Sequence, residues 1–280
     1  MLTIDRTLQD ESRGFFVEAP STGLSEPTLP WFPILMLHRV VEETPRPNPY
    51  NLCMSQRDLA RVIGFLRDSG YTMSTVEDAF EAWRHGEPVE RLACLTFDDG
   101  YRDFYTHALP VLESLRCPAS VHVVTRRLGE TNTWDALAMP EARLLTESEI
   151  RELDARGVRF GVHSATHPRL SRLTPEERIG EIAGAKRDLE DLLDREAEVF
   201  CYPHWDQDAN VRAEVLAAGY KAALGGEQPA HEPSLLHRVD LGRLDELSLR
   251  YRLHGWRHKL YRHPAVHNAK GAAKRLLKRG

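Results

Sequence analysis

The chain has 280 residues, of which 41% are hydrophobic and 28% charged, and its formal net charge is -5. This length suits one large domain or two small ones. The negative charge argues against a general nucleic-acid binder, so nucleic acid is not an expected partner. The four cysteines form no CxxC pair and mostly adjoin apolar runs, so we expect small buried residues rather than disulfide partners or zinc ligands.

Residues 1–30 are expected to form an N-terminal extension. The opening MLTIDRTLQDESRGFF contains acidic residues and no apolar core of signal-peptide length. No stretch approaches the roughly 18 consecutive apolar residues that a membrane-spanning helix needs. We therefore expect a cytoplasmic protein.

Between residues 31 and 246, short apolar runs alternate with segments of helical periodicity. The expected strands are Ile34–Val41, Ala93–Phe97, Ser120–Val124, Val158–Val162, Val199–Tyr202 and Ala222–Leu224. Apolar spacing predicts helices within 55–70, 106–116, 146–157, 174–196 and 210–219. Thr146 and Glu149 have the spacing of a capping box. Alternating strands and helices indicate βα units around a parallel sheet, so we expect one α/β domain over residues 31–246.

The last segment, residues 247–280, has ten Lys or Arg and no Asp or Glu. Such a run is typical of a solvated basic tail. The alternative is peripheral attachment to an anionic membrane, to which Tyr251, Trp256, Tyr261 and the Leu276–Leu277 pair would contribute.

The expected strand Ala93–Phe97 leads directly into Asp98, Asp99 and Gly100. Adjacent carboxylates after an apolar run are costly unless an opposite charge compensates them. The carboxyl ends of parallel strands are where α/β folds collect functional residues. Both acids can serve one site only if the chain leaves the strand there, which Gly100 permits. The structural alternative is a pair of acids that caps a turn.

A second polar cluster follows the expected strand Val158–Val162, where His163 and His167 are four residues apart. On a helical turn, two imidazoles at this spacing lie on one face and can share a metal ion. With one carboxylate they make a three-ligand site with an open position, the pattern of catalytic zinc. A cation would also explain the paired acids, because one becomes a ligand and the other stays free as a base.

The stretches TFDDG at 96–100 and HSATH at 163–167 resemble the first two motifs of the polysaccharide deacetylase family, the NodB homology domain or carbohydrate esterase family four. The resemblance extends from Ile34 to Leu241 and implies a distorted (β/α) barrel of NodB-like type. It also implies that Asp98 is the general base and that Asp99, His163 and His167 hold a divalent metal. Zinc is the favoured ion, and cobalt, nickel or iron also suit such ligands.

The third motif departs from the usual R-x-P-Y. The matching stretch is FCYPHW at 200–205, with Cys201 at the Arg position and His204 at the Tyr position. It is similar to a branch of the family that reads F-A-Y-P-Y-G and also lacks the Arg, although Trp205 replaces the Gly. A backbone N–H near His204 is a candidate oxyanion donor. What orients Asp98 stays open, with Asp206 and Asp208 as nearby polar candidates.

His38 in LMLHRV is the candidate general acid, because that branch appears to supply the acid from an early strand with a His-x-V ending. A histidine is suited to protonate a leaving amine near neutral pH. The competing candidate is His237 in SLLHRVDL, and a packed or surface histidine is the structural alternative. Candidate sugar contacts are Trp134, Tyr202 and Trp205, with packing at the barrel rim as the alternative for Trp134.

The expected function is a metal-dependent hydrolase that removes an acetyl group from an N-acetylated sugar and releases acetate. In the cytoplasm its acetylated carbohydrate would be a precursor, either lipid-linked or nucleotide-linked. The alternatives are an O-acetyl esterase, a hydrolase of a non-sugar amide, and a glycan-binding relative without turnover. A magnesium phosphotransferase is disfavoured by the paired histidines and by the lack of an evident phosphate-cradling loop.

Overall fold

A computed structural model describes residues 30–45, 48, 52–135, 142–226 and 232–241. The expected basic tail, and all but the last residue of the expected N-terminal extension, lie outside these residues. Within the described part of the chain, no helix is long and apolar enough to cross a membrane.

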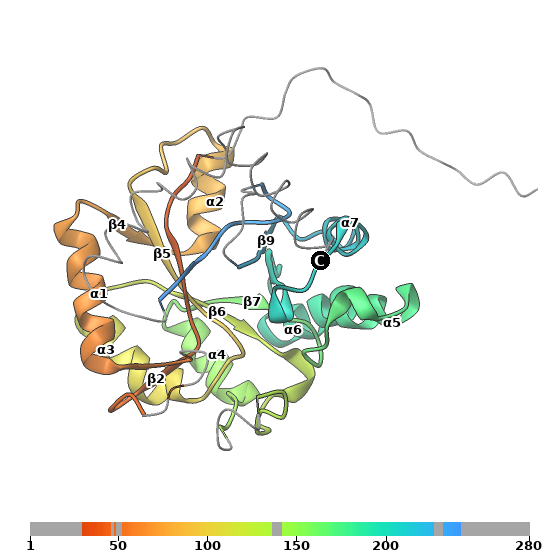
Figure 1. Ribbon diagram of the computed structural model, residues 1–280, viewed down its shortest axis with the longest axis horizontal. Helices are drawn as coiled ribbons and strands as arrows, with labels where there is room; N and C mark the ends of the chain where they lie inside the picture. The colour runs from red at the N-terminus through yellow and green to blue at the C-terminus, as the bar shows by residue number, and fades with distance from the viewer. Residues whose placement is uncertain (1–29, 46–47, 49–51, 136–141, 227–231, 242–280) are drawn as a thin grey trace, which may run out of the picture.

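A single curled parallel sheet occupies the middle of the molecule, with helices around its outer face (Figure 1). The strand order is β10-β1-β5-β6-β7-β8-β9, and β4 pairs with the first half of β5. The strands of this sheet are β1 (Ile34–Leu37), β4 (Thr72–Ser74), β5 (Leu92–Phe97), β6 (Ser120–Val123), β7 (Arg159–Val162), β8 (Val199–Cys201), β9 (Ala222–Leu224) and β10 (Val239–Asp240). This is the distorted, partly open (β/α) barrel that the sequence predicts.

The two edges of the curled sheet are joined by residues 233–240. The Leu236 N–H donates to the Ala223 carbonyl of β9, and the Arg238 N–H donates to the carbonyl of Gly226. Immediately afterwards, β10 pairs with β1 in parallel register. This closing segment therefore brings residues from the end of the described chain into the interior of the barrel.

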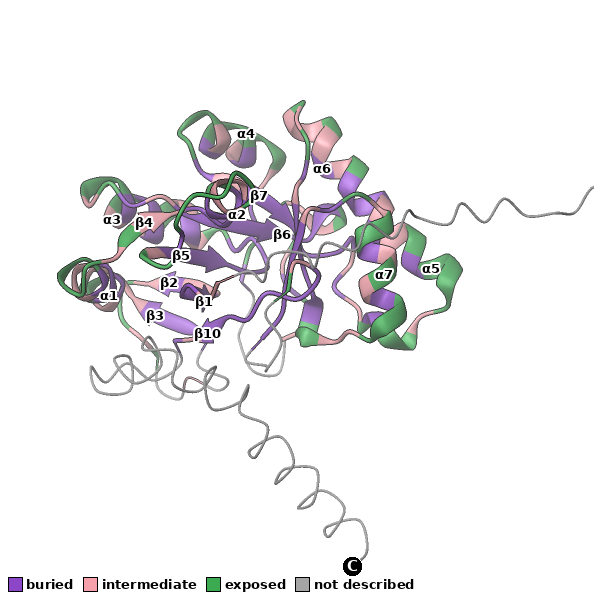
Figure 2. Cartoon of the chain, turned by 90° about the horizontal axis from the view of Figure 1, so that it is seen from above, coloured by how far each residue is buried: buried purple, intermediate pink, exposed green. Residues whose placement is uncertain are grey.

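Helices cover the convex side of the sheet, with their buried faces turned inward (Figure 2). They are α1 (Gln56–Asp68), α2 (Val76–Arg84), α3 (Leu109–Ser114), α4 (Glu147–Ala155), α5 (Pro175–Ile179), α6 (Ala185–Leu193) and α7 (Ala209–Ala217). The capping box predicted at Thr146 and Glu149 is present at the start of α4. Two π-helical turns, η2 (Phe104–Ala108) and η5 (Gly180–Gly184), interrupt helical segments that the sequence predicts as continuous.

The expected strands are found with ends that differ by at most one residue, except for the first. Ile34–Val41 divides at His38, because β1 pairs with β5 whereas the next strand, β2 (Arg39–Val41), pairs with β3 (Cys53–Ser55). The structure adds α2, β3, β4 and β10. The three added strands have only two or three residues each, too few for an alternating pattern to stand out.

Side-chain alternation gives the sheet two different faces. The outer face carries apolar residues such as Leu95, Phe97 and Val121, which belong to the main core under the helices. The inner face begins with a smaller apolar cluster that includes Cys94 and Val199. Toward the carboxyl ends of the strands this inner face becomes polar, and the candidate site lies there.

A substitution at Gly100 can test how tightly the chain is packed where it leaves β5. Its φ is +71°, and a Cβ atom there would lie 2.9 Å from Val123 Cγ1. Gly100→Ala is expected to lower the free energy of unfolding by about 2 kcal/mol or more, from backbone strain and overpacking together. Gly86→Ala is the matched control, because its φ is +77° with no atom within 4 Å of the added carbon. Equal losses of stability in urea titrations of the two variants would contradict this packing argument.

Candidate functional site: paired carboxylates at the carboxyl edge of the sheet

Asp98 and Asp99 leave β5 in different directions. The Asp98 N–H still donates to the Leu37 carbonyl of β1, so Asp98 continues the strand and faces the barrel interior. Asp99 has a φ of +70° and Gly100 a φ of +71°, so the chain turns at Asp99 itself rather than first at Gly100. Each acid is only 2% exposed. The turn places two buried carboxylates at one edge of the sheet with separate partners.

Asp99, His163 and His167 come together as predicted. Asp99 Oδ1 lies 3.4 Å from His163 Nε2 and 3.2 Å from His167 Nε2, and this buried oxygen has no hydrogen-bond partner of good geometry. His163 Nδ1 is 2.8 Å from the Cys201 carbonyl, which orients Nε2 toward Asp99. Two imidazoles and a carboxylate with converging atoms fit a divalent metal.

The two histidines converge through a loop, and the expected helical turn is wrong. Ser164 and His167 have φ values of +63° and +66°, and this backbone reversal brings the ring of His167 within 4.9 Å of the ring of His163. The carboxylate of Glu181, in η5, restrains the loop between His163 and His167. It accepts hydrogen bonds from the Ala165 N–H at 3.0 Å, and from the N–H and hydroxyl of Thr166 at 2.9 Å and 2.6 Å.

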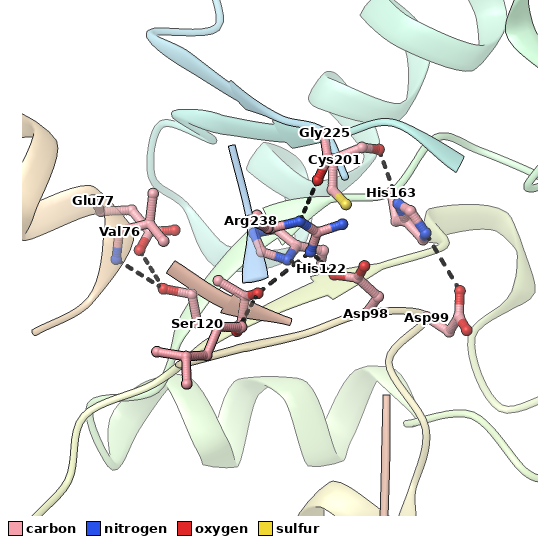
Figure 3. Close-up of polar contacts among 12 residues, drawn as sticks. Val76, Glu77, Asp98, Asp99, Ser120, His122, His163, Cys201, Gly225 and Arg238 are labelled. Atoms are coloured by element: carbon pink, nitrogen blue, oxygen red, sulfur yellow. Dashed lines mark hydrogen bonds and ion pairs between the residues drawn. The ribbon is translucent and has the colours of Figure 1, made fainter. Parts of the chain in front are cut away.

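Asp98 is held by residues that sequence reasoning missed. Arg238 Nη1 donates to Asp98 Oδ1 at 2.7 Å, and His122 Nδ1 lies 3.2 Å from the same oxygen (Figure 3). Burial raises the pKa of Asp98, but the Arg238 charge and the His122 hydrogen bond outweigh it and hold this pKa well below its usual range. Asp98 is therefore an ionised carboxylate at neutral pH.

The polar candidates named for orienting Asp98 have other partners. Asp206 accepts hydrogen bonds from the N–H and hydroxyl of Ser171 at 2.9 Å. Asp208 caps the start of α7 by accepting from the Val211 N–H. Arg238 is a charged residue inside the apolar run SLLHRVDL, which signals a buried charge but does not identify Asp98 as its partner. His122 lies in the apolar strand SVHV, where a lone histidine is usually a packed core residue.

His38 and His237 lie at different levels of the sheet. Leu37 pairs with Phe97, so His38 follows its strand at the level of Asp98. His38 is partly exposed and lines a pocket of about 620 Å³ at the end of β1. His237 precedes β10, whose Val239 pairs with Leu35, which places His237 toward the amino ends of the strands. The register favours His38 as the candidate acid.

Aromatic side chains surround the ring of His167. Trp134 stacks on it with centroids 4.5 Å apart and an interplanar angle of 25°, and the ring of His204 meets it edge-on at 4.5 Å. Burial, together with the nearby His167, Arg169 and His163 side chains, lowers the pKa of His204 to about 4. Trp205 is 45% exposed and packs over Gly226, where an added Cβ would lie 2.3 Å from the indole. Trp134 thus borders the cluster of Asp99, His163 and His167, whereas Trp205 packs on the loop after β9.

Tyr202 does not line this site, and the expected sugar contact is wrong for it. Its side chain is fully buried, its ring meets Phe200 edge-on, and its hydroxyl donates to the Ser234 carbonyl at 2.8 Å. Side chains alternate along β8. Cys201 faces the barrel interior, so Tyr202, the next residue, points toward the outer core together with Phe200. All four cysteines are buried and free, as predicted.

Tyr101 supports the site from behind Asp99. Its buried hydroxyl contacts the Asp99 carboxylate and accepts a hydrogen bond from Asn132 Nδ2 at 3.2 Å. Burial and the charge of Asp99 raise the pKa of Tyr101 far above its usual range, so the hydroxyl stays protonated.

The site and fold together define a class of protein: a parallel α/β barrel with an Asp–His–His cluster beside a second, ionised aspartate. The family model described as polysaccharide deacetylase matches residues 85–223. The chain belongs to the polysaccharide deacetylase family. At this coarse level it is a carbohydrate deacetylase, and therefore a hydrolase.

Relatives of known sequence and structure agree with this assignment. The chain is 24% identical over 212 residues to the Bacillus subtilis protein YxkH, itself assigned to the polysaccharide deacetylases, covering 74% of this chain and 70% of YxkH. It is 40% identical over 62 residues to the Escherichia coli poly-beta-1,6-N-acetyl-D-glucosamine N-deacetylase, which covers 22% of this chain and 9% of that protein.

Among solved structures, Streptococcus pyogenes deacetylase PplD in complex with acetate superposes with a TM-score of 0.68 at 22% identity, covering 79% of this chain and 97% of that one. IcaB from Ammonifex degensii gives 0.65 at 20% identity, covering 80% and 95%. At these identities the superpositions show the shared fold.

Glu181 is expected to support metal binding without touching the metal ligands. Glu181→Gln replaces one acceptor oxygen with a donor that opposes the loop N–H groups, so zinc affinity is expected to fall about 10- to 100-fold. Chelator competition measures this affinity. Glu177→Gln, the same change at the cap of α5, is the control and should leave zinc affinity unchanged. Indistinguishable affinities for the two variants would contradict the role of Glu181.

Proposed function

We propose that this protein is a metal-dependent N-deacetylase that hydrolyses the acetamide of an N-acetylated sugar. The observation that carries the proposal is the separation of two adjacent buried aspartates into different environments. Asp99 lies with two histidines in a donor set that fits a divalent ion, whereas Asp98 is paired with Arg238 and has no histidine of that set in hydrogen-bond contact. One acid is thus assigned to metal binding and the other to proton transfer.

A divalent ion bound by Asp99, His163 and His167 would supply Lewis acidity toward the acetyl carbonyl. Zinc suits two imidazoles and one carboxylate, and cobalt, nickel or iron are the other options. The chain's own residues carry the proton transfers. Asp98 takes a proton from the attacking water while the water oxygen bonds to the carbonyl carbon. The backbone N–H of His204 donates to the carbonyl oxygen, which becomes negative.

The C–N bond then breaks, and the leaving nitrogen needs a proton. His38 directly follows β1, the strand next to β5, and its place in the register is level with Asp98. We assign it as the group that protonates this nitrogen, so that acetate and a free amino sugar are released. Family membership supports a sugar substrate, and the N-deacetylase activity named for the Escherichia coli relative supports an amide rather than an ester.

The substrate we favour is a lipid-linked or nucleotide-linked precursor in the cytoplasm. This part of the proposal rests on the sequence, through the basic residues 247–280. Peripheral contact of those basic residues with anionic lipid would favour the lipid-linked form.

Asp98→Asn is expected to lower acetate release at least about 1,000-fold while zinc stoichiometry stays at one per chain, because the amide cannot accept the proton. Acetate is measured on a panel of N-acetylated and O-acetylated sugars. Asp206→Asn, a change outside the site, is the control for loss of a carboxylate. Wild-type activity in the Asp98 variant would refute the assignment of the base. Acetate release from O-acetylated sugars alone would replace the N-deacetylase with an esterase.

His38→Gln is expected to slow hydrolysis in proportion to the need of the leaving group for a proton. With an N-acetyl sugar kcat should fall about 100-fold, whereas an aryl acetate, whose phenolate leaves unprotonated, should lose less than about 3-fold. His237→Gln should lower neither rate specifically. An equal loss on both substrates in the His38 variant would argue against a general acid at this position.

A further inference from the structure

The interior of the barrel contains a buried polar group of three residues next to the metal-binding cluster. Asp98 is 2% exposed, and His122 and Arg238 are 0% exposed. Both partners contact the same oxygen, Asp98 Oδ1, at 2.7 Å from Arg238 Nη1 and 3.2 Å from His122 Nδ1. A fully buried guanidinium is costly unless it is paired, and its removal leaves the partner charge uncompensated. An apolar interior would satisfy stability at least as well, so the group calls for another explanation.

The guanidinium of Arg238 is fixed in orientation as well as paired. Its Nε donates to the Gly225 carbonyl at 2.6 Å (Figure 3). Its Nη1 lies 3.3 Å from Thr96 Oγ1. These contacts come from the interior strand β5 and from the loop after the edge strand β9, so two separate parts of the sheet hold the side chain. A bond to Asp98 from such an anchored group restrains the carboxylate in one plane.

Space for His122 is provided by the neighbouring strand. A Cβ atom at Gly161 of β7 would lie 2.6 Å from His122 Cδ2, so the imidazole occupies room that only glycine leaves. His122 Nε2 is buried and has no hydrogen-bond partner among the described residues. Native proteins seldom leave a buried polar atom unpaired without a compensating use. Here the other ring nitrogen faces Asp98.

The third sequence motif explains why Asp98 is held by side chains from β6 and from the closing segment. Cys201 stands where the family pattern has Arg, and its Sγ belongs to the same buried cluster as Asp98 and His122. The small thiol leaves the interior open to the guanidinium of Arg238, which enters from the closing segment. Although Asp98, His122 and Cys201 converge within 4.8 Å, Arg238 already supplies positive charge, so the cluster is not a second metal site.

We infer that Arg238 and His122 are positioning residues that together hold Asp98 Oδ1, in place of the missing motif-three arginine. The inference rests on the proposed function for the role of Asp98 as a base. The clamp keeps the Asp98 carboxylate in one rotamer beside the metal-binding cluster while Asp99 remains with the histidines. Neither positioning residue contacts Asp99.

Isosteric variants separate positioning from packing. His122→Asn retains a donor where Nδ1 lies, whereas His122→Leu has nearly the same shape without one. Arg238→Met removes the charge, and Arg238→Lys retains it. We expect kcat for acetate release to fall at least 10-fold in His122→Leu and 100-fold in Arg238→Met, with KM within 2-fold and zinc stoichiometry unchanged. His122→Asn should recover to within 3-fold of wild type, and Arg238→Lys should exceed Arg238→Met.

Arg178→Met is the matched control, because Arg178 is also buried and paired, with Glu214 at 2.6 Å and 2.7 Å, but between α5 and α7. It should lower stability and leave kcat unchanged. Unchanged kcat in both Arg238→Met and His122→Leu, or equal losses in the Asn and Leu variants, would overturn the inference.

Crystal structures of the zinc-loaded variants provide a readout that needs no turnover. The inference predicts that the Asp98 carboxylate rotates away in Arg238→Met and His122→Leu while Asp99, His163 and His167 stay in place. An unmoved Asp98 would overturn it. Wild-type protein that releases no acetate from any acetylated sugar would refute the proposed function, and the position of Asp98 would still decide this inference.

Discussion

Two ionised carboxylates on consecutive residues, both almost fully buried, are the constraint on which the rest of this structure depends. Their mutual repulsion in a low-dielectric interior is offset because each acid has its own partners. Asp98 faces Arg238 and His122, and Asp99 faces His163 and His167. Placing these partners requires β6, β7, the closing segment and the loop after β7. The polar part of the barrel interior supplies the charges and hydrogen bonds that two adjacent buried carboxylates need.

Backbone strain is concentrated around these carboxylates and the loops that carry their partners. Among the described residues, seven other than glycine have positive φ, and five of them border the site: Asp99, Ser164, His167, His204 and Trp205. Such conformations cost about 1–3 kcal/mol each and persist only when the surroundings impose them. Glu181 provides one such restraint on the HSATH loop, and the parallel strands on either side provide others. The backbone around Asp99, His163 and His167 is therefore restrained by the elements that pack against it.

Much of this arrangement could be predicted from the sequence, because strong local patterns carry it. The apolar runs located most strands, and the two polar clusters at their carboxyl ends located Asp98, Asp99, His163 and His167. What failed depended on contacts distant in sequence. Arg238 reaches Asp98 across 140 positions, and nothing local to either residue reports the pairing. Tyr202 looked like a site residue from its motif, yet strand alternation turns it outward into the core.

The closing segment has a consequence for how this protein comes into being. Asp98 and the histidines are synthesised well before Arg238, which lies in the last described strand region. A chain that has not yet joined its two sheet edges leaves the Asp98 carboxylate without its strongest partner. The environment of Asp98 is thereby tied to completion of the barrel. A nascent or truncated chain would contain Asp99, His163 and His167 but would lack the Arg238 side chain that holds Asp98.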